Sequence, residues 1–416
     1  MAGEVTITAS LNRPRFATLE TEQMAYVYLE ARPAEGATTA QAPLNLVLVL
    51  DRSGSMAGRK INDLRQAARL TLDRVAPADL VSIVVFDDTV AVLAAARPAA
   101  DRAALLAQID RIEERGGTQM SLGLRAGLEQ ARAGLGPGRV SRLVLLTDGE
   151  TWDDEDRCRE LAQTAAQMGV PITALGLGDE WNQALLTDLA ELSGGNWEFI
   201  DAPDRILEAF QQVVVAMQRT LVTNATLGLR LVKGVRAVAA WRVQPLIDRL
   251  SARAVGERDV QVTLGDLQSE GQSVLIELAV PPRAPGNYRL AQAEVNYDIP
   301  GGGAGRKASA DIVFTFVADP AGATAVNGAV MNIVERVSVF KLMTRALDER
   351  DSADAQQRTR RLQAAATRLL DAGEVELARE AEAAAAQLGA GQTLSPHATK
   401  RLVSATRRLD MSDLGS

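Results

Sequence analysis

Cysteine and histidine are almost absent from this chain of 416 residues, which has one of each, Cys158 and His397. A lone cysteine cannot form an intramolecular disulfide, and a protein without a disulfide framework is compatible with a reducing compartment. A single histidine excludes a multi-histidine metal centre and argues against mechanisms that need a histidine base.

Long apolar runs are also lacking. The longest candidate, Leu44–Leu50, is far too short to cross a hydrocarbon core of about 30 Å as a helix. The first ten residues alternate polar and apolar side chains and do not resemble a signal peptide. We therefore expect no membrane span and, by default, a cytoplasmic location.

The chain carries no excess of positive charge. Its formal net charge is -8, which argues against a broad nucleic-acid-binding surface. A hydrophobic content of 47% and a charged content of 24% are ordinary for a globular protein. At roughly 150 residues per domain, the length indicates two or three domains.

The central part of the chain, residues 41–220, alternates buried-strand patterns with helical patterns. This alternation predicts an α/β domain in which helices cover both faces of a mostly parallel, doubly wound sheet. The expected strands are Leu44–Leu50, Leu80–Phe86, Val140–Thr147, Val170–Gly176 and Trp197–Ile200. The expected helices are Ile61–Val75, Ala103–Ile112, Met120–Ala133, Glu160–Met168, Asn182–Leu192 and a closing helix over 206–217.

Period-two patterns on either side of this domain predict antiparallel strands, in residues 1–40 and again in residues 221–320. The N-terminal strands have too few partners to be stable alone, so we expect them to pair with the later sheet. The α/β domain would then be an insertion into a β-sandwich. Residues 321–416 have helical periodicity and predict three or four packed helices.

Oxygen-bearing side chains follow three of the predicted elements. Asp51, Ser53 and Ser55 come directly after the first buried strand, Thr118 precedes the helix at Met120, and Asp148 follows the strand that ends at Thr147. Ligands of open α/β sheets bind beyond the carboxyl ends of the strands, and hard cations prefer oxygen ligands. The sequence therefore predicts a divalent-cation site. The alternative is local: the serines cap the helix near Arg59, and Asp148 shapes a turn.

The set of motifs resembles the von Willebrand factor A family over roughly 44–218. The resemblance is carried by Asp51, Ser53 and Ser55 as D-x-S-x-S, Thr118 in GGT, and Asp148 in LLTDGE. It implies a metal-ion-dependent adhesion site in which the hydroxyls touch Mg²⁺, with Mn²⁺ or Ca²⁺ as other possibilities, while the aspartates act through water or hydrogen bonds.

The same resemblance implies a non-enzymatic interaction module that captures an Asp or Glu of a protein partner through the cation. Family members often work beside an AAA+ ATPase or a signalling enzyme. The order of sandwich strands, inserted domain and C-terminal helices also resembles bacterial calcium-activated chloride channel-like proteins, although no membrane span supports conduction. The remaining alternatives are a metal-dependent hydrolase, with Glu150 or Asp153 as base, and a structural scaffold with a vestigial site.

Residues around the predicted site are candidates for contact with a partner: Met56, Trp152 and Asp153. An exposed tryptophan at such a rim would be a contact hot spot, and plain packing is the alternative. The acidic run 153–156 either selects basic partners near the cation, holds a second ion, or forms a solvated loop that caps the next helix. A basic strip in the tail, formed by Lys400, Arg401, Arg407 and Arg408, either binds an acidic partner, closes against the α/β domain, or forms a solvated face. Cys158, between two arginines, is expected to be an inert thiol.

Overall fold

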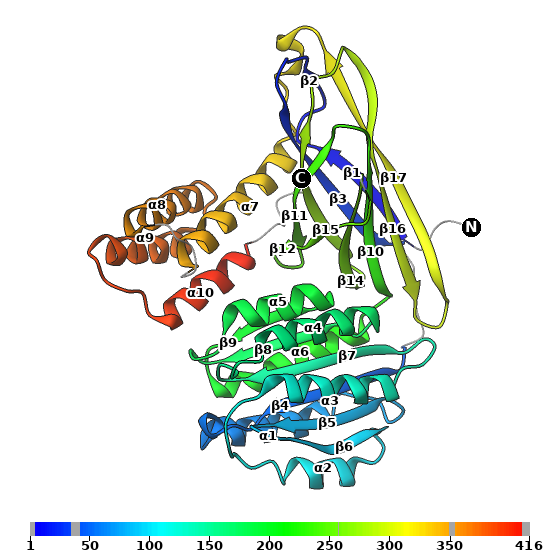
Figure 1. Cartoon of the computed structure of the whole chain (residues 1–416), viewed down its shortest axis with the longest axis vertical. Coiled ribbons are helices and arrows are strands. Elements are labelled where there is room, and N and C mark those ends of the chain that lie inside the picture. The colour runs from blue at the N-terminus through cyan, green and yellow to red at the C-terminus, as the bar shows by residue number, and fades with distance from the viewer. Residues whose placement is uncertain (1–4, 35–41, 257, 349–353, 410–416) are drawn as a thin grey trace.

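The computed structural model describes residues 5–34, 42–256, 258–348 and 354–409. It shows an α/β domain at one end, a β-sandwich at the other, and a group of helices beside them (Figure 1). The predicted fold class is confirmed, including the insertion of the α/β domain into the sandwich. Within the described residues, no helix is long and apolar enough to cross a bilayer.

The α/β domain is built on a six-stranded sheet with the order β6-β5-β4-β7-β8-β9. All neighbours are parallel except β5 and β6. Its strands are β4 (Leu44–Asp51), β5 (Leu80–Phe86), β6 (Val90–Pro98), β7 (Val140–Thr147), β8 (Ile172–Leu177) and β9 (Asn196–Ile200). The antiparallel edge strand β6 was not predicted from the sequence.

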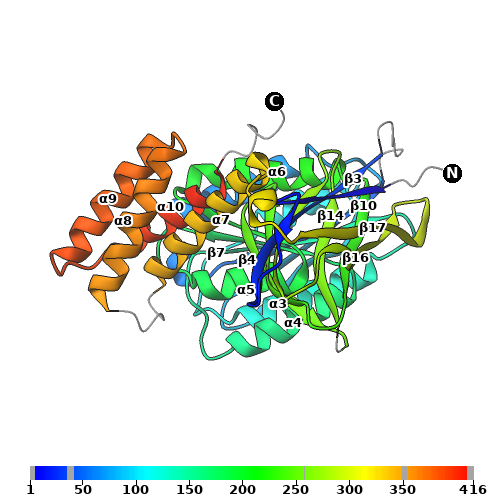
Figure 2. The same ribbon diagram turned by 90° about the horizontal axis from the view of Figure 1, so that it is seen from above.

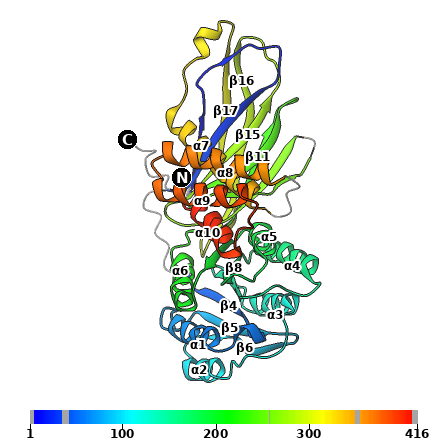
Figure 3. The same ribbon diagram turned by 90° about the vertical axis from the view of Figure 1, so that its left-hand side faces the viewer.

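Helices cover both faces of this sheet (Figure 3). One face packs against α3 (Met120–Ala133), α4 (Glu155–Gln167) and α5 (Gln183–Ser193), and the other against α1 (Arg59–Thr71), α2 (Arg102–Ile109) and α6 (Ile206–Gln218). Every residue of β4 is buried, as the apolar run predicts for a strand covered on two sides. The carboxyl end of β4 therefore lies at a well-supported position in the middle of the sheet.

The sandwich is formed by two sheets with the orders β1-β3-β15-β11-β12 and β13-β14-β10-β16-β17-β2. Strand β3 pairs along its length with β15, so the N-terminal strands complete a sheet made from the far side of the insertion, as expected. The strands are β1 (Val5–Leu11), β2 (Phe16–Ala17), β3 (Gln23–Pro33), β10 (Val222–Leu231), β11 (Arg236–Gln244), β12 (Asp248–Leu250), β13 (Ala252–Ala254), β14 (Asp259–Leu267), β15 (Gln272–Val280), β16 (Gly286–Ile299) and β17 (Gly303–Val317).

The C-terminal part contributes four helices to the described residues: α7 (Gly328–Leu347), α8 (Ala355–Asp371), α9 (Val375–Gly389) and α10 (Pro396–Arg407). Helix α7 packs against the sandwich strands β3 and β11, while α8 and α9 form a hairpin that projects to one side (Figure 2). Helix α10 returns to the α/β domain and contacts β9. This return places the end of the helical region beside the α/β sheet.

Candidate functional site

Asp51 is the last residue of β4 and has no exposed surface. Its Oδ1 accepts a hydrogen bond from the backbone N–H of Ser53 at 2.7 Å, and its Oδ2 accepts one from the hydroxyl of Thr147 at 2.6 Å. Burial raises the pKa of Asp51 to about 6, and these hydrogen bonds only partly oppose that effect. The carboxylate is thus a buried charge that a cation nearby would stabilise.

The two serines of the same loop lie side by side, and one of them bonds to Asp148. The Oγ atoms of Ser53 and Ser55 lie 3.0 Å apart, and Ser55 donates a hydrogen bond to Asp148 Oδ1 at 2.6 Å. The other carboxylate oxygen of Asp148 accepts a hydrogen bond from the ammonium group of Lys60 at 2.5 Å. Asp148 follows β7, the neighbour of β4, so parallel pairing brings the two aspartates to one edge of the sheet.

Thr118 lies at the same edge. Its Oγ1 is 3.9 Å from the point where a Cβ on Gly149 would lie, and the Oγ of Ser55 is 3.8 Å from that point. Backbone hydrogen bonds fix this loop, from Gly54 N–H to the carbonyl of Gly116 and from Trp152 N–H to the carbonyl of Thr118. The five predicted side chains therefore come from three loops that are hydrogen-bonded to one another.

The local alternative for the serines does not hold. Helix α1 has Gly58 at its N-cap position, and no side chain caps it. Ser53 precedes the short 3₁₀ turn Gly54–Met56 and makes no side-chain capping bond there. The two hydroxyls lie within hydrogen-bond distance of each other, and that of Ser55 donates to Asp148 instead.

The donor set fits a hard divalent cation. Two neighbouring ligands of an octahedral Mg²⁺, each about 2.1 Å from the metal, stand about 3.0 Å apart, which matches the separation of the two serine oxygens. No group of three or more His, Cys, Asp or Glu side chains in the described residues is arranged to hold a metal ion. A cation here would depend on hydroxyl oxygens as well as on the two carboxylates.

The three candidate partner contacts differ in their exposure to solvent. Met56 is wrong as a partner contact, because its side chain is fully buried in the core beneath the loop. Trp152 is 77% exposed, so plain packing does not explain it. Asp153 is exposed and adopts a left-handed backbone conformation with φ 52°, which is uncommon for a residue other than glycine.

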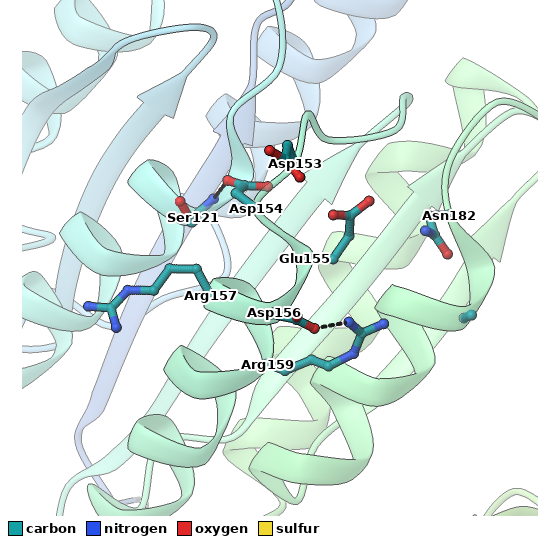
Figure 4. A pocket seen from close by; sticks show the side chains of 9 residues that line it. Ser121, Asp153, Asp154, Glu155, Asp156, Arg157, Arg159 and Asn182 are labelled. Atoms are coloured by element: carbon teal, nitrogen blue, oxygen red, sulfur yellow. Dashed lines mark hydrogen bonds and ion pairs between the residues drawn. The ribbon is translucent and has the colours of Figure 1, made fainter.

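The residues of the acidic run 153–156 have two kinds of environment: one is buried in the structure, and the others line a pocket. Asp154 is buried and accepts a hydrogen bond from the backbone N–H of Ser121, so it caps α3 as well as preceding α4. Asp153, Glu155 and Asp156 line a shallow pocket together with Asn182 (Figure 4). The pocket carries net negative charge beside the exposed tryptophan.

Two charged residues that contact the loops of the candidate site, Lys60 and Asp87, were not predicted from the sequence. Asp87 accepts hydrogen bonds from the guanidinium of Arg52 at 2.7 Å and from the backbone and hydroxyl of Thr89. Burial opposes its ionisation, but the Thr89 hydrogen bonds and the charge of Arg52 outweigh burial and lower the pKa of Asp87. Lys60 stands nine residues after Asp51 in the segment DRSGSMAGRK. This closeness in sequence is the only signal that could have pointed to it.

The basic strip in the tail does close against the α/β domain, at three of its four positions. The Lys400 ammonium donates hydrogen bonds to the carbonyls of Asp179 and Trp181, in the loop after β8. Burial lowers the pKa of Lys400 to about 8. Arg407 is buried as well, and Arg408, although exposed, pairs with Glu198 of β9, whereas Arg401 remains exposed and pairs with Glu380 of α9.

Cys158 is buried on α4, and burial together with nearby Asp154 raises its pKa. The two flanking arginines do not activate it. The expectation of an inert thiol agrees with this environment.

The chain thus contains a doubly wound α/β domain with hydroxyl and carboxylate side chains gathered at the carboxyl edge of its sheet. Residues 45–212 match the von Willebrand factor type A domain, and residues 328–412 match the Sll0103-like C-terminal alpha-helical domain. The chain contains a von Willebrand factor type A domain, and domains of this family often mediate protein–protein interactions.

Two relatives illustrate the similarity in sequence. The uncharacterized protein sll0103 of Synechocystis sp. is 34% identical over 268 residues, and the match spans 63% of this chain and 63% of that protein. Inter-alpha-trypsin inhibitor heavy chain H3 of Rattus norvegicus is 34% identical over 160 residues, which are 36% of this chain and 18% of that protein.

A solved structure matches the whole arrangement. The von Willebrand factor type A protein from Catenulispora acidiphila superposes with a TM-score of 0.81 over 98% of this chain and 97% of its own. The two sequences are 18% identical, so this likeness concerns the fold alone.

Proposed function

We propose that this protein binds a protein partner through a divalent cation held by Asp51, Ser53, Ser55, Thr118 and Asp148. Mg²⁺ is the expected ion, with Mn²⁺ or Ca²⁺ as substitutes. The partner would supply an Asp or Glu side chain as the remaining ligand. The protein would act as an interaction module and not as an enzyme.

The observation that carries this proposal is the meeting of the two serine hydroxyls of the Asp51 loop with the buried carboxylate of Asp148 from another loop. Ser53 and Ser55 are 3.0 Å apart, and Ser55 bonds to Asp148 across 93 residues of sequence. A hydroxyl that donates its proton to a carboxylate keeps its lone pairs for a metal. Neutral ligands leave much of the cation's charge uncompensated, which favours capture of a carboxylate from outside.

The surface beside the site suits a protein partner. Trp152 offers a large exposed aromatic surface, and tryptophan is among the residues that most often dominate binding energies. The neighbouring carboxylates of Asp153 and Asp156 would favour a partner that has a basic residue close to its metal-binding carboxylate. We therefore propose Trp152 and Asp153 as partner contacts.

Calorimetric titration of Mn²⁺ and Mg²⁺ tests the metal site. We expect the wild type to bind, and Asp51→Ala to bind at least ~10-fold more weakly, as is typical when an outer-shell carboxylate is removed. Asp110→Ala, which removes an exposed carboxylate at the end of α2, is the control and should match the wild type. Equal affinities of the wild type and Asp51→Ala would contradict the metal site.

Capture of a partner tests the interaction. A partner retained by the wild type should be released by EDTA and lost with Asp51→Ala, while Trp152→Ala should weaken capture without changing the affinity for Mn²⁺. An AAA+ ATPase or a signalling enzyme is the expected kind of partner, and cell fractionation tests the expected cytoplasmic location. Magnesium-dependent hydrolysis of phosphate esters or peptides by the wild type would contradict the non-enzymatic role.

A further inference from the structure

Lys60 places a positive charge where the proposed cation would act. It is the second residue of α1, and its ammonium nitrogen lies 2.5 Å from Oδ2 of the fully buried Asp148. The lysine side chain itself is 31% exposed, whereas the carboxylate that it contacts is fully buried. The position makes Lys60 a direct competitor for one of the two carboxylates.

A lysine in the first turn of a helix is electrostatically unfavourable unless another interaction stabilises it, and here Asp148 provides that interaction. The N-terminal turn of a helix carries a partial positive charge, which favours acidic residues and disfavours basic ones. The first turn of α1 contains no acidic residue, yet begins with Arg59 and Lys60. Arg59 pairs with the half-buried Asp63 and the exposed Asp204, whereas Lys60 is paired with a buried carboxylate.

Every carboxylate oxygen of the site already has a donor. The oxygens of Asp51 accept from Ser53 N–H and the Thr147 hydroxyl, and those of Asp148 accept from Ser55 and Lys60. Three of these four donors are neutral and are compatible with a cation in the same place. Only Lys60 brings a full positive charge, which repels a divalent ion and neutralises part of its counter-charge.

We propose that Lys60 is a built-in counter-ion of the metal site: it stabilises Asp148 when no metal is bound and lowers the affinity for divalent cations. The inference rests on the proposed metal-dependent function and concerns its regulation. With Lys60 in place, two carboxylates and one ammonium leave a single net negative charge against a divalent ion. The site with its bound ion therefore keeps a net positive charge, which a partner's carboxylate can neutralise. Retention of the metal is thereby coupled to capture of the partner.

Calorimetric titration of Mn²⁺ alone into four proteins tests the proposal: wild type, Lys60→Met, Lys60→Gln and Arg59→Met. We expect both Lys60 variants to bind Mn²⁺ roughly 10-fold more tightly than the wild type, because a repulsive charge close to the ion is removed. Arg59→Met removes the same charge from the adjacent position and is the matched control, with affinity within about twofold of the wild type. Lys60→Gln can still donate a hydrogen bond to Asp148, so it serves if Lys60→Met does not fold.

Thermal unfolding gives a readout that does not depend on a partner. Without metal, Lys60→Met should unfold at a lower temperature than Arg59→Met, because Asp148 loses a buried ionic partner. Saturating Mn²⁺ should raise the unfolding temperature of Lys60→Met by more than that of the wild type.

The outcomes separate this inference from the proposed function. If the wild type binds Mn²⁺, Asp51→Ala does not, and the Lys60 variants bind no more tightly than Arg59→Met, then the counter-ion role is overturned and the metal site stands. If none of the proteins binds Mn²⁺, both are overturned. If the wild type binds Mn²⁺ and both Lys60 variants bind it more tightly than the wild type and Arg59→Met do, the counter-ion role is supported.

Discussion

Single residues in this protein show how burial and partners set the charge state of a side chain. Glu191 on α5 lies against the sandwich, where its Oε2 accepts a hydrogen bond from the hydroxyl of Ser251 at 3.1 Å. Burial, and then the negative charge of Asp248, raise the pKa of Glu191 to about 7. The hydrogen bond opposes this shift without cancelling it. The ionised form of Glu191 is therefore disfavoured in the folded protein.

The pKa of Glu191 leads to a prediction about stability and pH. Its folded-state pKa is above the ordinary value of 4.5, so the folded protein holds more protons than the unfolded chain between pH 4.5 and about 7. The contribution of Glu191 to stability falls as pH rises through that window. We expect Glu191→Gln to be more stable than the wild type at pH 8, on the order of 1 kcal/mol, and to lose this advantage near pH 4.5.

Chemical denaturation at a series of pH values measures this difference. Glu160→Gln, at an exposed position on α4, is the control and should follow the wild type at every pH. A constant difference between Glu191→Gln and the wild type from pH 4.5 to 8 would contradict the assignment.

At the residue scale, the candidate ligands could be predicted from the sequence, but their neighbours could not. Asp51, Ser53 and Ser55 form a short local motif, and Asp148 follows a recognisable buried strand. Lys60 binds Asp148 across 88 residues, and Arg407 meets Asp248 across 159. No local pattern contains such contacts, because they arise only when distant elements pack together.

Helix α3 illustrates the scale of the single element. It runs from the Thr118 loop across the centre of the sheet, and two glycines on one side allow it to approach closely. A Cβ on Gly127 would lie 2.5 Å from Val49 Cγ2 and 2.9 Å from Leu143 Cδ1, and a Cβ on Gly123 would lie 2.6 Å from the ring of Phe86. The position of α3, and with it that of Thr118, depends on this close packing.

Substitution at Gly127 should therefore disturb both stability and the site. We expect Gly127→Val to destabilise the protein by about 1–3 kcal/mol through overpacking and to weaken Mn²⁺ binding by displacing the Thr118 loop. Gly136→Val is the control, because its Cβ would contact only the guanidinium of Arg139 at 4.0 Å. Unfolding curves and Mn²⁺ titration of both variants measure the effects, and a Gly127→Val protein as stable as the wild type would contradict this account.

Elements with strong local signals were predicted closely from the sequence. The predicted bounds of β5, β7 and α3 agree with the structure, because buried strands and an amphipathic helix have characteristic periods. Strand β6 was missed because its exposed edge position and its run Ala94–Ala96 weaken the alternation. Strands β12 and β13 have three residues each, which is too few for a period to be recognised.

At the scale of the whole molecule, one buried arginine joins three parts of the chain. Arg407 at the end of α10 donates hydrogen bonds to both carboxylate oxygens of Asp248 in the sandwich, at 3.0 and 2.6 Å. It also binds the carbonyl of Trp197 in β9 at 2.7 Å, and its guanidinium lies 4.0 Å from the centre of that indole ring. Arg242 binds the same aspartate at 2.5 Å.

Removal of Arg407 should loosen the helical region from the rest of the protein. We expect Arg407→Met to destabilise the protein by on the order of 3 kcal/mol, because it leaves buried polar groups without their partner. It should also increase hydrogen exchange in α10. Arg401→Met is the matched control, since Arg401 lies on the same helix and pairs with Glu380 at an exposed site. Unchanged exchange in α10 of the Arg407 variant would contradict the anchoring role.

The two covalent connections of the inserted domain have a mechanical consequence. The chain enters the domain after β3 and leaves it through α6 into β10, and both connections lead to the same sandwich. Two connections to the same sandwich restrict the motion of the domain. The domain can tilt about the line that joins them, but it cannot rotate freely as a domain on a single linker could. The Arg407 cluster adds a further attachment, beside the ion pair of Arg142 with Asp266 and the hydrogen bond from Ser251 to Glu191, so a tilt of the domain relative to the sandwich would require such contacts to open.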